Sequence, residues 1–357
     1  MRGKALASLA IMGIILGGCA TERWSKETYE ASRPRKVSVA GLEGAGTGVM
    51  WSTSVLGGEV EEIYPLGDIV CVYTKAKRLI VLDANRGVEL WRVLLPLRLQ
   101  FGPFRHRDVV YFSLHDAIYG FDAKTGEELW TKRLEVALSS PPTLFADQLM
   151  AGSNTNIFGA WPIRSDRVTW SILRCRTTEK AVVSGSTVYV PSMGGLLRAV
   201  DVASGRVRWS YPTGRDFMTS PTLITGGVAL GTDEGGVYRI SEEGKKGWLT
   251  VLKRPVKRVL AEGDVVAAMT VPDGAVMVNA ETGEEGPTVA KASKLAAISD
   301  KVACFLAGGE LVAVSREDGQ ESWRLPLGEF SVVAENPTSD EVYCSTKSGA
   351  MAALKLK

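Results

Sequence analysis

The chain has 357 residues, of which 45% are hydrophobic and 23% are charged, and its formal net charge is +2. This is an ordinary globular composition, and the length is ample for a large core. A charge so close to neutral gives no electrostatic reason to expect nucleic acid as a partner.

The first 18 residues have the pattern of a bacterial export signal. Arg2 and Lys4 precede a 12-residue apolar stretch from Ala5 to Leu16, which is too short to span a bilayer. Leu16-Gly17-Gly18-Cys19 then resembles a lipobox, which implies cleavage before Cys19 and attachment of lipid to it. A multiply acylated cysteine anchors a protein stably. The alternative is an ordinary signal peptide with a chance cysteine.

Residues 19–46 are polar and then rich in glycine, which predicts a flexible tether between the lipid anchor and the folded domain. The stretch Gly44-Ala45-Gly46-Thr47-Gly48 lacks the Lys-Ser/Thr ending of a phosphate loop, so a linker is favoured there. Ala20 follows the cysteine. By resemblance to enterobacterial sorting, the absence of Asp at this position favours the outer membrane, with the folded domain facing the periplasm.

From residue 47 to 357 the chain is built of repeats of 36 to 40 residues, each marked by an aromatic anchor. Repeats of this length, cut by glycine-rich turns, are typical of the blades of a β-propeller. The anchors are Trp51, Trp91, Trp130, Trp170, Trp209, Trp248, Pro287 (where a Trp is expected) and Trp323.

A turn motif precedes most of these anchors. In its three clearest copies an Asp is followed four residues later by a Gly and eight residues later by the Trp: Asp83, Gly87 and Trp91; Asp122, Gly126 and Trp130; Asp201, Gly205 and Trp209. Degenerate copies end at Trp248, at Pro287 and, through Gly319, at Trp323. The weakest copy has Asp166 where the Gly before Trp170 belongs.

The motif has a conformational interpretation. The Asp can accept backbone N–H bonds in the turn, the Gly supplies a left-handed residue, and the Trp on the outer strand fills the gap between neighbouring sheets. We therefore interpret the motif as structural, and not as a cofactor-binding element.

Each repeat divides into four short strands. In the third repeat we expect them at 142–145, 148–152, 157–161 and 168–173, and in the fifth at 221–224, 227–231, 236–240 and around Trp248. The last repeat ends at Ala350–Leu354 without an outer strand, and Val49–Val55 is an outer strand without a blade. Pairing the two closes the ring and removes exposed edges.

The prediction is therefore an all-β fold, an eight-bladed β-propeller of four-stranded antiparallel blades closed by the N- and C-terminal strands. A seven-bladed ring requires one misinterpreted repeat, and the segment 287–323 is the weakest candidate.

Residues with catalytic or metal-binding potential are few. Cys71, Cys304 and Cys344 occupy equivalent second strands, about 10 Å apart in packed sheets and beyond the roughly 7 Å limit of a disulfide, so we expect these three and Cys175 to be buried thiols. The two histidines lack metal-ligand spacing. With no Gly-x-Ser-x-Gly elbow either, the sequence predicts no catalytic residue, no metal and no cofactor.

The repeat Asp-Ala-x-Thr-Gly-x-x-x-Trp of residues 122–130 resembles the tryptophan-docking repeat of the quinoprotein (PQQ-like) propellers, and the resemblance covers residues 49–357. One branch of this family consists of dehydrogenases that carry PQQ and calcium. The other includes the BamB-type lipoproteins of outer-membrane β-barrel assembly. The compact repeats, the lipobox and the lack of a Cys-Cys pair favour the second branch.

The BamB-type resemblance implies a non-enzymatic, monomeric scaffold that binds the barrel-insertion subunit BamA and helps to deliver unfolded outer-membrane proteins. Leu95, Leu97 and Arg98 have the Leu-x-Leu-Arg pattern of that family's docking loop, although closer to the Trp and in an earlier blade. The simpler interpretation is a strand end with one exposed Arg. The dense basic stretch Lys253–Arg258 is a further candidate partner surface.

Two other functions stay open. One is a quinoprotein that binds PQQ and calcium in the central funnel. The other is a propeller that binds glycans through exposed aromatic residues such as Trp161 or Phe158.

Overall fold

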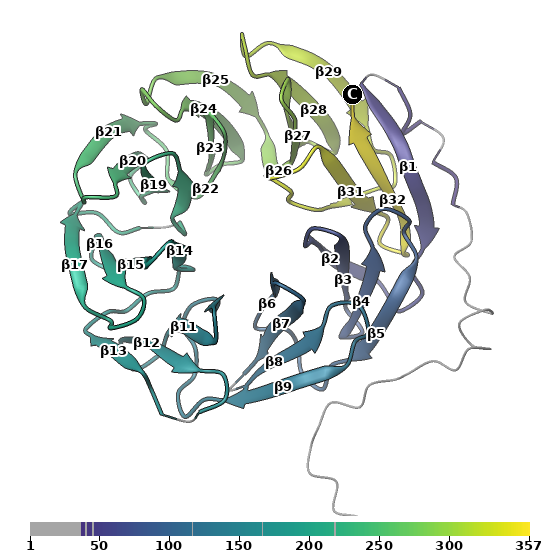
Figure 1. Cartoon of the computed structure of the whole chain (residues 1–357). Coiled ribbons are helices and arrows are strands. Elements are labelled where there is room, and N and C mark those ends of the chain that lie inside the picture. Colours follow the sequence, from purple (N-terminus) through teal and green to yellow (C-terminus); the bar gives the residue numbers. More distant parts are fainter. Residues whose placement is uncertain (1–36, 40, 45, 116, 166, 218) are drawn as a thin grey trace, which may run out of the picture.

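The computed structural model describes residues 37–39, 41–44, 46–115, 117–165, 167–217 and 219–357. These residues form 32 strands in eight four-stranded antiparallel sheets, arranged as blades around a central axis (Figure 1). The prediction of an eight-bladed propeller is confirmed, and the seven-bladed alternative is wrong. The predicted signal, Cys19 and most of the predicted tether lie outside the described residues.

Within a blade the strands follow chain order from the axis to the rim. The first four blades comprise β2 (Val60–Pro65), β3 (Ile69–Thr74), β4 (Arg78–Asp83) and β5 (Glu89–Leu94); β6 (Phe101–His106), β7 (Val109–Leu114), β8 (Ala117–Asp122) and β9 (Glu128–Arg133); β10 (Thr143–Phe145), β11 (Gln148–Gly152), β12 (Ile157–Pro162) and β13 (Trp170–Leu173); and β14 (Val182–Ser184), β15 (Thr187–Ser192), β16 (Leu196–Asp201) and β17 (Val207–Pro212).

The next three blades and the closing blade follow. They comprise β18 (Thr222–Ile224), β19 (Gly227–Gly231), β20 (Gly236–Ser241) and β21 (Lys246–Val251); β22 (Val256–Glu262), β23 (Val265–Thr270), β24 (Gly274–Asn279) and β25 (Glu285–Ala290); β26 (Ala292–Ile298), β27 (Val302–Ala307), β28 (Glu310–Ser315) and β29 (Glu321–Pro326); and β30 (Val332–Val333), β31 (Glu341–Ser345) and β32 (Ala350–Leu356) with β1 (Thr47–Ser54).

The closing blade joins the two ends of the chain. Its strand order is β1-β32-β31-β30, and β1 pairs antiparallel with β32, with Trp51 opposite Ala353 and Ser54 opposite Ala350. The predicted closure is confirmed. The predicted strands of the third and fifth repeats are confirmed, and most of their ends coincide, with shifts of one or two residues at the others.

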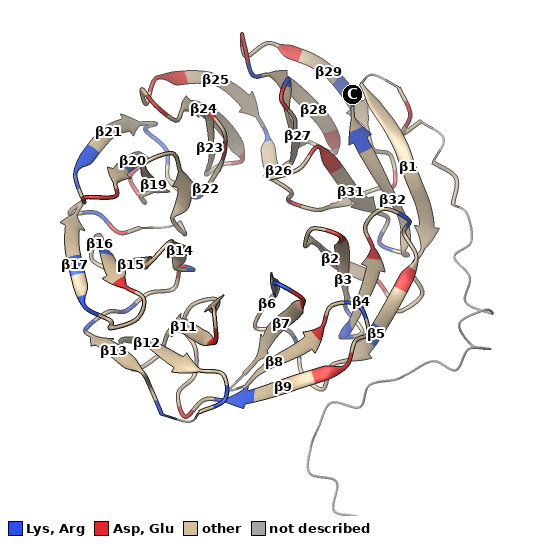
Figure 2. Cartoon of the chain, viewed as in Figure 1, with Lys and Arg blue, Asp and Glu red and all other residues tan. Residues whose placement is uncertain are grey.

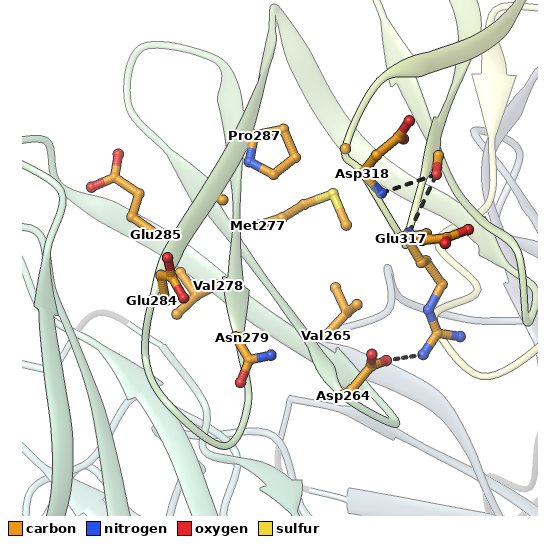
Figure 3. Close-up of a pocket in the computed structure, with 14 residues that line it drawn as sticks. Asp264, Val265, Met277, Val278, Asn279, Glu284, Glu285, Pro287, Glu317 and Asp318 are labelled. Carbon is orange, nitrogen blue, oxygen red and sulfur yellow. Dashed lines mark hydrogen bonds and ion pairs between the residues drawn. The ribbon is translucent and has the colours of Figure 1, made fainter.

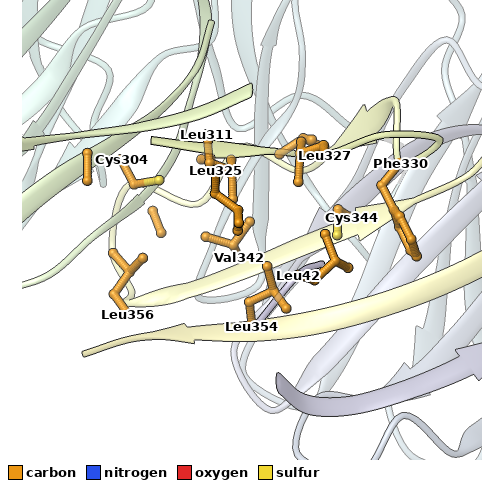
Figure 4. Close-up of a cluster of buried hydrophobic side chains, with 14 of the residues drawn as sticks. Leu42, Cys304, Leu311, Leu325, Leu327, Phe330, Val342, Cys344, Leu354 and Leu356 are labelled. Carbon is orange, nitrogen blue, oxygen red and sulfur yellow. The ribbon is translucent and has the colours of Figure 1, made fainter. Parts of the chain in front are cut away.

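The core lies between neighbouring sheets. Second strands such as β3 and β23 are buried along their whole length because a sheet covers each of their faces, and so they lack the apolar–polar alternation of a half-exposed strand. Cys71, Cys175, Cys304 and Cys344 are buried free thiols, as predicted. Figure 4 shows Cys304 and Cys344 in the cluster beside the closing blade.

Part of the segment assigned to the tether packs on this cluster. Leu42 is buried among Leu327, Phe330 and Leu356 (Figure 4), and the hydroxyl of Thr47 donates to the Leu42 carbonyl oxygen over 2.9 Å. The described chain contains no helix long and apolar enough to cross a membrane.

Candidate functional site

Five tryptophans of the repeat each join their blade to the next one along the chain, whereas the indole of Trp130 lies against Gly120 of its own sheet. The indole nitrogen of Trp51, on β1, donates to the Ala84 carbonyl oxygen of the neighbouring blade over 2.6 Å. The same bond recurs from Trp91 to Ala123 (2.9 Å), Trp170 to Val202 (2.8 Å), Trp209 to Glu242 (2.7 Å) and Trp248 to Ala280 (3.0 Å). The repeat is thus a set of seams between blades.

The motif glycine allows each indole to lie against the next blade. Gly126 has φ of +70°, and an ideal Cβ on it would lie 2.5 Å from Cγ of Trp91. Gly87 under Trp51 and Gly205 under Trp170 have the same geometry. Both requirements, a left-handed backbone and no side chain, are met only by glycine.

The motif aspartates cap the turns. Oδ1 of Asp122 accepts the backbone N–H groups of Lys124 and Thr125 over 3.0 and 2.7 Å, which lowers the pKa of this carboxyl. Asp83 caps its turn in the same way, and Asp201 also pairs with Arg208. These acids have structural partners, which agrees with the conformational interpretation of the motif.

The seam at the ring closure uses a glycine that sequence reasoning placed in a linker. An ideal Cβ on Gly46, whose φ is +102°, would lie 2.3 Å from the indole nitrogen of Trp323. Gly46 therefore has the role in the closing blade that Gly87 has in the next one. The signal was available, because Gly46 stands five residues before Trp51 and its motif is only one residue longer.

The seam at Pro287 differs from the others, because a proline ring replaces the indole. An ideal Cβ on Gly319, across this seam, would lie 2.3 Å from Cγ of Pro287. A pocket of about 300 Å³ opens beside the proline, and its walls include Met277, Val265 and Arg316 (Figure 3). The pocket lies beside the position that an indole covers at the tryptophan seams.

Most exposed apolar side chains gather on one face of the ring. Two kinds of connection lie on this face: the links from an outer strand to the next inner strand, and the turns between second and third strands. Backbone hydrogen bonds join the two, for example from Leu95 N–H to Lys77 O and from Val271 N–H to Pro255 O. We call this side, with the outer-strand ends that lead into it, the connection face. It carries seven of the twelve exposed large apolar residues among the described ones: Leu56, Leu94, Leu97, Leu173, Met193, Val251 and Val271.

The Leu-x-Leu-Arg element lies on the connection face. Leu95 is 1% exposed and belongs to the core, whereas Leu97 is 52% exposed. Arg98 forms an ion pair with Glu61 of the same blade. The structure therefore presents one leucine and a paired arginine to solvent.

The basic stretch 253–258 is divided between two surfaces. Lys253 and Arg254 are exposed in the link between β21 and β22, on the connection face. Lys257 pairs with Asp273, and Arg258 lines the central channel, where it pairs with Glu335. Figure 2 shows Lys and Arg dispersed around the ring among acidic residues.

The central channel is a mixed-charge cavity of about 710 Å³ formed by inner strands and the links that precede them. The ammonium group of Lys180 lies 3.9 Å from the centroid of the Phe104 ring, and burial lowers its pKa to about 8. Burial raises the pKa of Glu179, which accepts a bond from Ser220 over 3.3 Å, and also that of Glu335. The channel can therefore hold a small polar ligand.

The described residues contain no group of three or more His, Cys, Asp or Glu side chains placed to hold a metal ion. The channel lining mixes Lys and Arg with Glu, and Glu335 is already paired with Arg258, so it does not fit the hard-oxygen cage of calcium. Burial raises the pKa of the Cys344 thiol to about 12 and that of Cys304 still further, so neither thiol is a ready nucleophile.

One of the two aromatic residues that we expected to be exposed for glycan binding is buried, so the prediction is wrong for it. Phe158 is fully buried between the third and fourth blades, because its strand position faces the neighbouring sheet. Trp161 is half-buried and lines a groove of about 540 Å³ with Leu134 and Val168.

The sequence profile of the family described as "Outer membrane protein assembly factor BamB" matches residues 35–172, 75–223 and 160–357. Among curated proteins, the outer membrane protein assembly factor BamB of Burkholderia pseudomallei is 25% identical over 157 residues, which is 41% of this chain and 41% of the relative. The chain thus matches about two fifths of the length of that relative.

Two solved structures have the same fold at low identity. BamB from Moraxella catarrhalis superposes with a TM-score of 0.70 at 16% identity, covering 87% of this chain and 98% of the other. A quinohemoprotein alcohol dehydrogenase from Pseudomonas putida gives 0.63 at 11% identity, covering 92% of this chain and 79% of the other.

Proposed function

The chain belongs to the family described as outer membrane protein assembly factor BamB, and from this premise we propose that it is a non-enzymatic scaffold that assists the assembly of outer-membrane β-barrel proteins. The observation that carries the proposal is the family match across 35–357, which takes in all eight blades. In this proposal the partners are envelope proteins, namely a BamA-type barrel-insertion subunit and unfolded barrel proteins.

The connection face is the surface we propose for the partner. Exposed large apolar side chains are more numerous on this face than elsewhere on the described surface, and such side chains are candidates for contact with another protein. Leu97, Leu173 and Val251 are each more than half exposed there. The exposed Lys253 and Arg254 add a basic element that can steer an acidic partner surface.

An anchor at Cys19 would hold this scaffold at the inner leaflet of the outer membrane, with the propeller in the periplasm. The proposal rests on the sequence pattern of residues 1–19. Acylation with several chains satisfies the requirement that stable anchoring needs more than one lipid signal.

The test is co-purification from gently solubilised envelopes, with the tagged full chain and mass spectrometry as the readout. We expect recovery of a BamA-type subunit with the wild type and loss of membrane association with Cys19→Ala. Leu97→Ser should reduce recovery of the subunit. Leu129→Ser is the matched control, because Leu129 is 48% exposed but is the second residue of the outer strand β9, whose start lies on the opposite side of the ring. Enrichment of an unrelated envelope complex alone would refute the assembly role.

A second candidate is a propeller that binds a small ligand in its central channel, which the size of the channel favours although its lining does not fit calcium. Ligand pockets commonly have volumes of roughly 300–1,000 Å³. Saturating PQQ with Ca²⁺ should raise the melting temperature of the propeller and shift the quinone spectrum if the channel binds the cofactor. No response at saturation would remove this candidate.

A further inference from the structure

We propose that the pocket at Pro287 is a docking site for an aromatic side chain, ideally an indole, carried on a basic segment of a partner polypeptide. The inference goes beyond the assembly role, because it does not depend on which envelope protein the partner is. It rests on three features of the seam between β25 and β29: an unfilled place, an unused acceptor and an acidic rim.

The unfilled place follows from comparison with the other seams of the same ring. At Gly126 the atoms that cover the glycine are Cγ, Cδ2 and Cβ of Trp91, and at Gly319 they are Cγ, Cβ and Cδ of Pro287. Proline therefore replaces the inner part of the indole and has nothing to replace its outer ring. The space beside it has a volume of about 300 Å³, with the side chains of Met277 and Val265 in its walls (Figure 3).

The unused acceptor is the carbonyl oxygen of Arg316. It stands three residues before Gly319, as the carbonyl of Ala84 stands before Gly87 and that of Ala123 before Gly126. Those two carbonyls each accept an indole N–H, whereas no described residue donates a hydrogen bond to that of Arg316. An indole in the pocket would supply the missing donor.

The rim selects the charge of the segment that carries the aromatic ring. Glu284 and Glu285 border the pocket from one blade, and Glu317 and Asp318 border it from the next (Figure 3). All four are exposed, and none forms an ion pair with another described residue. The one cation in the lining, Arg316, is already paired with Asp264. Lys or Arg residues flanking the aromatic ring would match this rim.

The test uses the full-length protein and the labelled amidated peptide Lys-Arg-Trp-Arg-Lys, with fluorescence anisotropy at low salt as the readout. We expect saturable binding, and its loss when the peptide Trp is replaced by Ala. Pro287→Trp should abolish binding because the new side chain fills the pocket. The triple variant Glu284→Gln, Glu285→Gln, Glu317→Gln should weaken binding about tenfold and reduce its salt dependence.

Each other outcome overturns the proposal. Equal binding by Pro287→Trp or by the Ala peptide would place the contact elsewhere or make it purely electrostatic. If Pro287→Trp does not fold, the triple glutamine variant tests the proposal by itself, because the exposed carboxamides leave the packing of the seam unchanged. Unweakened binding by that variant would then contradict the proposal. Binding that appears only after Trp24→Ala would mean that the chain's own tryptophan, between Arg23 and Lys26, occupies the pocket instead of a partner. Loss of the assembly partner in co-purification would leave this result unchanged, so the two proposals fail separately.

Discussion

Two seams of the same ring, one at Trp91 and one at Pro287, solve the same packing problem in different ways. Both set an outer-strand residue over a left-handed glycine of the next blade, Gly126 with φ of +70° and Gly319 with φ of +71°. At the first seam an indole fills the gap and donates to the Ala123 carbonyl oxygen. At the second a proline covers the glycine and leaves a pocket.

The difference shows which part of the repeat the ring requires. The left-handed glycine turn is present at both seams, so the backbone approach of neighbouring blades does not depend on the indole. The indole adds buried area and one hydrogen bond to that approach. A ring can therefore close with a proline at one of its seams, and a pocket is then present beside it.

The largest expected effect comes from removing a docked indole. Trp91 is 8% exposed and stacks on Phe121 with ring centroids 5.8 Å apart. Trp91→Ala should lower the free energy of unfolding by about 3–5 kcal/mol, because the cavity adds to the lost transfer energy. Pro287→Ala should cost about 1 kcal/mol or less, because a pocket already exists there. Guanidinium unfolding of both variants measures the contrast, and equal losses would show that the two seams contribute alike.

The next effect separates the strain of a left-handed backbone from the contact with the indole. Gly126 and Gly214 have φ of +70° and +72°, but an ideal Cβ on Gly214 has nothing within 4 Å. Gly214→Ala should therefore cost only the conformational penalty of about 1–2 kcal/mol. Gly126→Ala should cost about 1–3 kcal/mol more, because its Cβ would overlap Trp91. Thermal unfolding of both variants measures the difference. Equal losses of stability would mean that the indole of Trp91 moves aside without cost.

The sequence was sufficient for the fold because its periodic signals are local. An Asp, a Gly four residues later and a Trp eight residues later specify a capped turn and a seam, so the eight blades and the closing pair of β1 with β32 were predictable. The role of Gly46 was missed, because its partner Trp323 lies almost a whole chain away. The pocket at Pro287 could be suspected from the missing Trp, but its walls come from two blades.

The candidate surfaces were less predictable than the fold. The Leu95–Arg98 pattern does not tell which leucine is buried, since that depends on the turn at which the chain leaves β5. The basic stretch 253–258 looked like one patch, but β22 begins within it and directs Lys257 and Arg258 to other partners. Strand boundaries of this kind are the least certain part of sequence reasoning.

A smaller effect of opposite sign should follow when the missing indole is restored. Pro287→Trp places a Trp over Gly319 and within reach of the free Arg316 carbonyl. It should raise the free energy of unfolding by about 1–2 kcal/mol, since filling a cavity and satisfying an acceptor both stabilise. The variant is compared with wild type by guanidinium unfolding followed by tryptophan fluorescence. Destabilisation would mean that the blades on either side of this pocket have moved too close for an indole.

The smallest expected effect concerns Lys180, which lines the central channel and lies away from the seams between outer strands. Burial holds the pKa of Lys180 near 8, below its ordinary value of 10.5, so the charged form is disfavoured in the folded state. The unfolded chain then binds more protons between pH 8 and 10.5, and stability rises with pH across that window. Lys180→Met should stabilise by about 1 kcal/mol below pH 8, because the contact of the ammonium group with the Phe104 ring offsets part of the desolvation penalty. The gain should vanish above about pH 10.5, and Lys294→Met, which loses a bond of 2.8 Å to the Val333 carbonyl, should show no such gain. A pH-independent gain from Lys180→Met would attribute the effect to packing, and the lining of the central channel would then contribute to stability in the same way as the seams.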